Sequence, residues 1–183
     1  MKKKMKTAAL VMALCLIVLS IVGCGSESDQ NSGSARDASF DFSAYPADFS
    51  AWTMAEMKSY LKECGITANE DFLGMDMTEG DLGVIGAEAG YLYMDTDGGT
   101  VSDMIIYFDV SKEDGKAMID TTVEHKAIVI DGDVENGMAM DAVVGGFCFS
   151  YTMGTDEDHI SAFAQALKAL ETQYAIKADY INE

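Results

Sequence analysis

The sequence predicts an α+β domain in which an antiparallel sheet of about four strands carries helices on one face. Three observations support this fold class. Hydrophobic residues recur at helical spacing in three segments. Shorter segments are either continuously apolar or alternate between apolar and polar residues, as strands do. Turns rich in Gly or Asp separate these segments. In chain order the predicted elements run helix, hairpin, helix, hairpin, helix. Residues 40–183 are long enough to form one domain with its own core.

The domain begins with an aromatic lead-in and a helix. Disordered tethers seldom carry many aromatic residues, so we expect this lead-in to pack on the domain; it contains Phe40, Phe42, Tyr45 and Phe49. Thr53-Met54-Ala55-Glu56 has the form of a capping box, and Gly65 suits the left-handed residue that follows a helix. The apolar stripe of the predicted helix consists of Met54, Met57, Leu61 and Cys64.

The first predicted hairpin follows a loop. Glycines interrupt residues 67–87, which we expect to form a loop with one short strand near Leu82–Ile85. Gly90–Asp95 predicts a strand, and Thr96-Asp97-Gly98-Gly99 predicts the turn after it. Val101–Val110 then predicts a second strand. Because both faces of that strand are apolar, we expect it to be central in the sheet.

The second hairpin lies between two further helices. Ser111 is the predicted cap of the first of these helices. Ala127–Ile130 predicts a third strand, residues 131–137 a turn, and Met138–Tyr151 a fourth strand or a bent pair. Gly145-Gly146 within it indicates either a bulge or a close approach of two backbones. The last helix, capped by Thr155 or Asp156, carries its apolar residues at Ile160, Phe163, Leu167, Leu170 and Tyr174.

The N-terminal segment has the features of an export signal. Four lysines within Met1–Lys6 precede Thr7–Val22, which is uncharged and mostly apolar. These 16 residues would rise only about 24 Å as a helix, less than the roughly 30 Å of a hydrocarbon layer. We therefore expect a signal peptide at residues 1–23 that is removed, and no spanning helix.

Ile21-Val22-Gly23-Cys24 resembles the lipobox of bacterial lipoproteins. The resemblance covers only this leader, and beyond it no domain family is identified. It implies that the Cys24 thiol receives a diacylglycerol and becomes the first residue. Two or three acyl chains would then anchor the protein in the cell membrane, on its extracytoplasmic face. Residues 24–39 are polar and predict a flexible tether.

The charge of the chain limits its partners. After Cys24, eight Lys and Arg stand against 31 Asp and Glu, which leaves a formal charge of −23. Such a surface repels nucleic acid and anionic lipid, so we expect no nucleic-acid partner. Beyond Cys24, Cys64 and Cys148 remain. The compartment permits a disulfide between them, but their spacing indicates no disulfide framework and favours two buried thiols.

Catalytic and metal-binding patterns are sparse. There is no Gly-x-Ser-x-Gly elbow, and His125 and His159 have no neighbouring cysteines, which suits surface residues better than zinc ligands. Cys148 between two phenylalanines is typical of a buried thiol. No cofactor is predicted.

Two acidic turns and two methionine pairs are the candidate metal ligands. The acidic pairs begin like calcium loops but lack the Gly at position six and the Glu at position twelve, so hairpin turns are the better interpretation; they are Asp95 with Asp97 and Asp131 with Asp133. Met75-Asp76-Met77 and Met138-Ala139-Met140 could each place two thioethers on one strand face for Cu(I). A methionine-rich core is the alternative, and the more ordinary one.

The sequence favours a non-enzymatic binding or protein-interaction module displayed outside the membrane. Its partner would be a cell-envelope component or a protein. We expect its site near Gly145-Gly146 and the aromatic strand residues, which are Tyr91, Tyr93, Phe147, Phe149 and Tyr151; core packing is the competing role for those rings. The alternatives are a cell-envelope hydrolase that uses carboxylates and a metal-binding lipoprotein for calcium or copper.

Overall fold

The computed structural model describes residues 40–67, 72–95, 102–151 and 157–180. They build a six-stranded antiparallel sheet in the order β1-β2-β3-β7-β6-β8 and a separate two-stranded hairpin, β4-β5. The strands are β1 (Phe72–Asp76), β2 (Ala89–Asp95), β3 (Ser102–Tyr107), β4 (Ala127–Ile130), β5 (Asp133–Ala139), β6 (Ala142–Val144), β7 (Phe147–Ser150) and β8 (Ala178–Tyr180). The helices are α2 (Met54–Glu63), α3 (Glu79–Ile85), α4 (Glu113–His125) and α5 (Glu157–Tyr174), with 3-10 turns η1 (Phe42–Ala44) and η2 (Phe49–Ala51).

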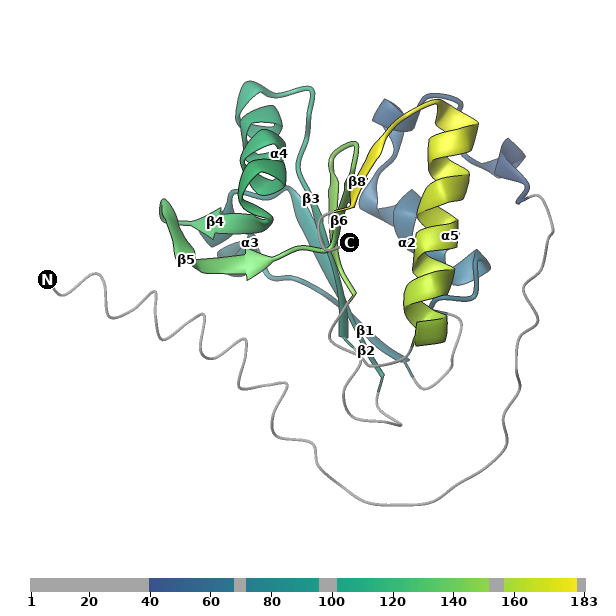
Figure 1. The fold of residues 1–183 in the computed structure, drawn as a ribbon, viewed down its shortest axis with the longest axis horizontal. Helices are drawn as coiled ribbons and strands as arrows, with labels where there is room; N and C mark the ends of the chain where they lie inside the picture. Colours follow the sequence, from purple (N-terminus) through teal and green to yellow (C-terminus); the bar gives the residue numbers. More distant parts are fainter. Residues whose placement is uncertain (1–39, 68–71, 96–101, 152–156, 181–183) are drawn as a thin grey trace, which may run out of the picture. The chain divides into compact units, whose positions relative to one another are not determined.

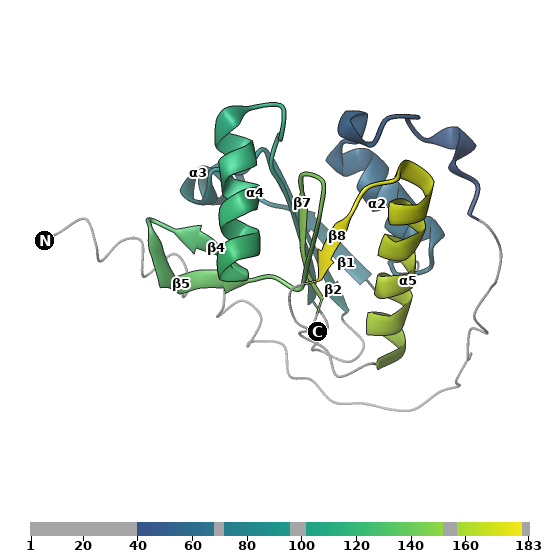
Figure 2. The ribbon, with the colours of Figure 1, turned by 45° about the horizontal axis from the view of Figure 1, so that its top comes forward.

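The helices lie on both faces of the sheet. Helices α2 and α5 cover one face, while α3, α4 and the β4-β5 hairpin lie on the other (Figures 1 and 2). The predicted α+β class and antiparallel pairing are confirmed, but the prediction of about four strands with helices on one face is wrong. The reason lies in the central strand β3, where Ile105 and Ile106 are both fully buried although they point to opposite faces. A strand that is apolar on both faces needs a covering layer on each.

The two layers enclose two cores. The core under α2 and α5 contains most of the aromatic side chains, including those of the lead-in, as predicted. The core under α4 is mostly aliphatic and contains Ile85, Ile106, Phe108, Ile128, Ile130, Met140, Val143 and Cys148. Cys64 ends α2 on the first side while Cys148 contacts Thr122 of α4 on the second. Both thiols are free; Cys148 is buried and Cys64 half-buried.

Helix α2 forms as its sequence signals predict. The Thr53 N–H donates to Glu56 at 2.9 Å, and the Ala55 N–H donates to the Thr53 hydroxyl oxygen at 3.2 Å. At the other end Gly65 has φ +82°, and the Ile66 N–H reaches back to the Leu61 carbonyl at 3.0 Å. These are the bonds of a capping box and a Schellman ending.

The segment before β2 differs from its prediction. Residues 72–76 form edge strand β1, paired antiparallel with β2, and the expected strand at Leu82–Ile85 is part of helix α3. Thr78 caps α3 by accepting the Asp81 N–H at 3.3 Å, and Gly86 ends it with φ +70°. Both capping residues are ordinary helix signals. The glycines inside α3 have a poor helix propensity, so the sequence between the caps does not predict a helix.

The turns of the second half are tighter than predicted. Asp131 and Gly132 both have positive φ, at +52° and +75°, as a two-residue type I′ turn requires, so β5 begins at Asp133 inside the expected turn. Gly145-Gly146 joins β6 to β7 as a hairpin turn and is not a bulge. Of the two alternatives for Met138–Tyr151, one strand or a bent pair of strands, the structure therefore has the pair. Ser111 does not cap α4. Its hydroxyl donates to Asp109 at 2.6 Å, and the cap residue is Lys112.

A short repeat precedes α2. Asp41–Ala44 and Asp48–Ala51 have the same sequence, Asp-Phe-Ser-Ala, and each forms a 3-10 turn. In both copies the Asp side chain accepts the N–H of the serine two residues later at 2.9 Å. The repeat thus folds twice into the same capped turn, each ending in an aromatic residue.

Candidate functional site

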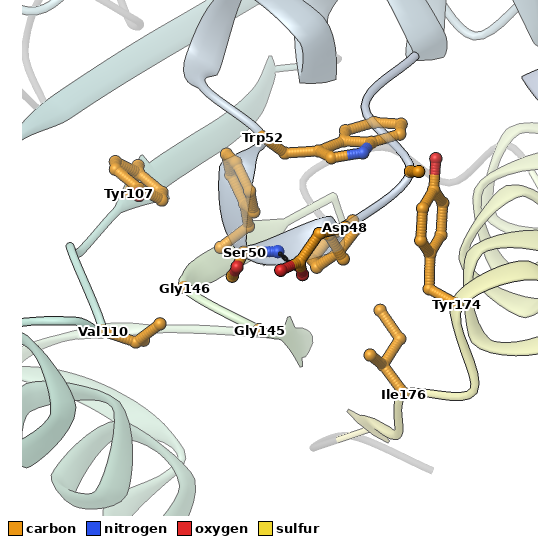
Figure 3. A pocket seen from close by; sticks show the side chains of 12 residues that line it. Asp48, Ser50, Trp52, Tyr107, Val110, Gly145, Gly146, Tyr174 and Ile176 are labelled. Atoms are coloured by element: carbon orange, nitrogen blue, oxygen red, sulfur yellow. Dashed lines mark hydrogen bonds between the residues drawn. The ribbon is translucent and has the colours of Figure 1, made fainter. Parts of the chain in front are cut away.

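A pocket of about 350 Å³ opens beside the Gly145-Gly146 turn (Figure 3). Three parts of the chain that are far apart in sequence form its walls. They are the lead-in with η2 (residues 47–52), the ends of β3, β6 and β7, and the segment that follows α5. This turn is where the sequence predicts the binding site.

The second Asp-Phe-Ser-Ala turn forms one wall. Asp48 begins it by accepting the Ser50 N–H at 2.9 Å, and the Trp52 N–H closes it on the Phe49 carbonyl at 3.0 Å. This turn directs Phe49 and Trp52 inward, and both side chains are buried. The Phe49 ring lies against Gly145, where an added Cβ would come within 2.6 Å of it.

The two glycines allow the floor of the pocket to form. Gly145 has φ +55°, which only glycine adopts readily, and Gly146 lies directly on the backbone of Phe108. The Phe108 N–H donates to the Gly146 carbonyl at 2.8 Å. The close approach that the sequence predicted is therefore real. It brings the Tyr107 and Phe147 rings to a centroid distance of 4.7 Å at the edge of the pocket.

The end of α5 forms the third wall. The Tyr174 ring lies 5.4 Å from Phe49 and 5.6 Å from Trp52 between centroids, and its hydroxyl donates to the Pro46 carbonyl at 3.0 Å. Figure 3 shows Tyr174 and Tyr107 on opposite sides, with Asp48 between them. These contacts tie the lead-in to the last helix, so the pocket depends on the assembled domain.

The pocket combines one charge with an otherwise aromatic and neutral lining. The hydrogen bond from the Ser50 backbone lowers the pKa of Asp48, so this exposed carboxylate is ionised at neutral pH. None of the twelve described lining residues is Lys, Arg, His or Cys. The Trp52 Nε1–H is buried and makes no hydrogen bond to any described residue. Such a lining can bind a ligand, and of the side chains common in acid–base catalysis those twelve residues include Asp48 and two tyrosines but no His, Lys or Cys.

The predicted metal ligands are only partly described. Asp97 and the side chain of Asp95 lie outside the described residues, as does Cys24. Asp131 and Asp133 are exposed, and Asp133 accepts the Glu135 N–H at 3.0 Å at the start of β5. Within the described ranges, no group of three or more His, Cys, Asp and Glu could hold a metal ion.

The methionine pairs pack into the domain. Met140 is fully buried, and Met75 and Met138 are half-buried. The Met77 sulfur lies against the backbone of Gly90, where a Cβ would clash with it. This packing is what a methionine-rich core provides.

Most of the aromatic strand residues are core residues. Tyr93, Phe147, Phe149 and Tyr151 are buried, and of these Phe147 alone is among the described residues that line the pocket. Sequence reasoning missed the roles of Trp52 and Tyr174. The repeated Asp-Phe-Ser-Ala motif directly before Trp52 is a signal that could have indicated the role of Trp52. Tyr174 has no such signal, because it continues the apolar stripe of a helix.

His159 is not the surface residue that the sequence predicted. Its Nε2 lies 2.9 and 3.0 Å from the two carboxylate oxygens of Asp103, with side chains 13% and 1% exposed respectively. Burial raises the pKa of Asp103, and the hydrogen bond from His159 partly opposes that shift. Burial also raises the pKa of the Cys148 thiol to about 12, so this thiol is a poor nucleophile.

Comparison with protein-family models, with curated proteins and with solved structures finds no match for this chain. None of the described helices is both long and apolar enough to cross a membrane.

Proposed function

We propose that this protein is a lipid-anchored, extracytoplasmic binding module that holds a small ligand in the pocket beside Gly145-Gly146. The lipobox at Ile21–Cys24 supports the anchor, and the polar residues 24–39 support a tether of about 20–25 Å r.m.s. reach. The domain at residues 40–183 carries the pocket. That pocket is the single observation on which the binding function depends.

The construction of the pocket supports a ligand site. Its volume of about 350 Å³ falls within the usual range for small-molecule sites. Its walls come from a capped turn, a sheet end and a helix end, which are ordered elements held by hydrogen bonds. Two adjacent glycines let the Phe49 ring and the Phe108 backbone pack directly on the turn. A mainly apolar lining that includes aromatic rings and a few polar groups is typical of such sites.

The alternatives gain no specific support from the described residues. A carboxylate hydrolase needs two carboxyl groups on either side of the scissile bond. Asp48 is the one carboxylate among the twelve described lining residues, and Asp103 is buried against His159. A calcium site would need a cluster of carboxylates, and the described ranges hold no group of three or more His, Cys, Asp and Glu. Of the residues offered for copper, Met140 is fully buried. We therefore propose binding rather than hydrolysis or metal handling.

A pocket-filling variant tests the binding function. Ala47 is exposed at the pocket, so Ala47→Phe should occupy it without disturbing the core. Ala44→Phe makes the same change at an exposed site on η1, away from the lining. A ligand found by a thermal-shift screen of the purified full chain against envelope fragments and metabolites should raise the melting temperature of the wild type and of Ala44→Phe. Ala47→Phe should lose that shift, and an undiminished shift would contradict the proposal.

A pair of cysteine variants tests the anchor. Cys24→Ser removes the thiol that the lipobox predicts to be acylated, while Cys15→Ser changes a cysteine inside the leader. We expect the wild type and Cys15→Ser to incorporate labelled palmitate and to sediment with membranes. Cys24→Ser should do neither. Equal labelling of Cys24→Ser would show that the resemblance to lipoproteins is accidental.

A further inference from the structure

We propose that two copies of this protein pair along strand β1 and form a symmetric dimer with one continuous antiparallel sheet. β1 (Phe72–Asp76) is an edge of the six-stranded sheet, and no described strand pairs with its outer side (Figure 1). None of the twelve described residues that line the pocket belongs to β1. The inference therefore goes beyond ligand binding and does not depend on it.

The outer side of β1 presents backbone groups that can pair with another strand. The Met77 N–H donates to the Gly90 carbonyl at 2.9 Å, so the backbone of this residue faces β2. Inward-facing and outward-facing residues alternate along an antiparallel strand, so the backbones of Gly74 and Asp76 face outward. No described residue outside the sheet hydrogen-bonds to either backbone. The edge thus offers N–H and carbonyl groups at the spacing that a further strand requires.

β1 lacks the features that protect other strands of this protein from pairing. Natural edge strands avoid association by being short, by carrying Lys or Pro, or by bulging. The opposite edge of the sheet, β8, has three residues, and Lys177 pairs there with Asp179. The register of the β4-β5 hairpin shifts between Ile128 and Ile130. β1, in contrast, has five residues in unbroken register with β2, contains no Lys or Pro, and leaves Leu73 47% exposed.

The sequence of β1 is complementary to itself, which favours a second copy as the partner. A two-fold axis at Gly74 pairs this glycine with its own copy and places Leu73 opposite Met75 of the other copy. Apolar pairs of this kind stabilise adjacent strands. Asp76, the only charged residue of β1, does not face its own copy in this register, and Lys58 already pairs with it at 3.0 Å. Self-pairing along β1 therefore opposes no like charges within the strand.

The two faces of the edge both gain contacts in such a dimer. On one face the Tyr91 hydroxyl lies over Gly74, where an added Cβ would come within 1.9 Å of it. Tyr91 is half-buried, and the Lys58 ammonium lies 3.9 Å from its ring centroid. A two-fold axis at Gly74 brings the Tyr91 rings of the two copies to the same side of the shared sheet. Leu73 and Met75 lie on the opposite face, because side chains alternate along a strand.

The acidic charge of the chain sets the condition under which the dimer forms. The sequence carries a formal charge of −19, so two copies repel each other at long range. Salt screens this repulsion but has little effect on backbone pairing and apolar contacts. We therefore expect the dimer to become tighter as sodium chloride rises from about 0.01 M to 0.3 M.

A matched pair of lysine variants tests the surface. Leu73 and Val134 are both exposed strand residues, at 47% and 45%, but Val134 lies on β5. Sedimentation equilibrium of the full chain in about 0.3 M sodium chloride gives the dimer dissociation constant. Leu73→Lys should raise that constant about tenfold, because it places a charge at the centre of the pairing. Val134→Lys makes the same change in net charge and should leave the constant within about twofold.

A proline variant tests the backbone pairing itself. The Asp76 N–H faces outward, so Asp76→Pro removes a donor from the edge and keeps the bonds to β2. Asp76→Ala also loses the pair with Lys58 but keeps the N–H. Asp76→Pro should weaken the dimer about fivefold or more, whereas Asp76→Ala should not weaken it. Melting curves of both variants verify that they are folded.

A cross-link tests the register. Residues 73 and 75 of the two copies form a non-hydrogen-bonded pair when Gly74 lies on the axis, with Cα atoms about 4.5 Å apart. That separation suits a disulfide. Under mild oxidation, a mixture of Leu73→Cys and Met75→Cys should yield linked dimers above the wild-type background. A mixture of Leu73→Cys and Val134→Cys should not.

The outcomes that overturn the inference are distinct from those that overturn the binding function. A protein that stays monomeric at every salt concentration contradicts the dimer. So does a dimer that Leu73→Lys and Asp76→Pro leave unchanged, because its interface then lies elsewhere. If β1 captures an extended basic peptide while the protein itself stays monomeric, the edge belongs to another partner and self-pairing is wrong. Ala47→Phe tests the pocket separately, so either proposal can fail without the other.

Discussion

The Asp103–His159 pair is a hydrogen-bonded polar contact, and the Asp103 side chain is almost fully buried. Asp103 comes from β3 and His159 from the first turn of α5, and both carboxylate oxygens lie within 3.0 Å of the imidazole Nε2. A buried carboxylate loses its hydration, and one good partner does not fully restore it. The raised pKa of Asp103 is the signature of that incomplete compensation.

The raised pKa predicts how Asp103 affects stability with pH. The native state holds the Asp103 proton more tightly than the unfolded chain, whose aspartate titrates at its ordinary value near 3.8. Its contribution to stability is therefore complete below about pH 3.8 and is lost as pH rises through the native pKa. The free energy of unfolding of the wild type, relative to Asp103→Asn, should therefore fall as pH rises above about 3.8 and through the raised native pKa of Asp103. Urea unfolding of both proteins measures this difference, and parallel curves would refute it.

At the scale of the elements, the helix caps show which helix ends the local sequence predicts and which it does not. Helix α2 has its signals at both ends, in the Thr53 capping box and at Gly65, and it formed as predicted. Helix α3 has comparable signals in Thr78 and Gly86 but two glycines between them, so its propensity misled the prediction. Ser111 resembles a cap, yet Asp109 takes its hydrogen bonds and α4 starts later.

Two matched substitutions test the roles of these hydroxyls. Thr53→Ala removes the capping box of α2, so it should lower the free energy of unfolding by about 1 kcal/mol. Ser111→Ala removes the hydroxyl that the sequence assigns to α4, but the structure gives it no bond to that helix, so its effect should be within about 0.5 kcal/mol. Chemical denaturation of the two variants gives both numbers. A larger loss in Ser111→Ala than in Thr53→Ala would mean that the cap assignments are reversed.

At the scale of the whole molecule, the sheet and the pocket both depend on contacts between distant residues. The sequence indicated that β3 is apolar on both faces, which was correct, but it gave no strand order and so no second layer of helices. The Gly145-Gly146 turn could be identified as a close approach. The other two walls could not, because nothing local shows that residues 47–52 and Tyr174 meet there.

The strongly acidic composition acts on the molecule as a whole. The sequence has 31 acidic residues against 12 Lys and Arg. Within the described ranges, acidic side chains form ion pairs with Lys58, Lys112, Lys168, Lys177 and the two histidines. Like charges on a folded domain repel one another and destabilise the compact state. Salt screens that repulsion, because the Debye length shrinks from about 30 Å at 0.01 M to about 10 Å at 0.1 M.

The melting temperature of the full chain should therefore rise at pH 7 as sodium chloride increases from about 0.01 M to 0.3 M. The same titration near pH 4 is the control, because carboxyl groups of ordinary pKa are then partly protonated and the net charge is small. There the rise should shrink, even though the salt itself is unchanged. Scanning calorimetry at both pH values makes the comparison. An equal rise at the two pH values would mean that salt acts on the apolar surface, and a flat response at pH 7 would mean that the acidic residues are too far apart to repel.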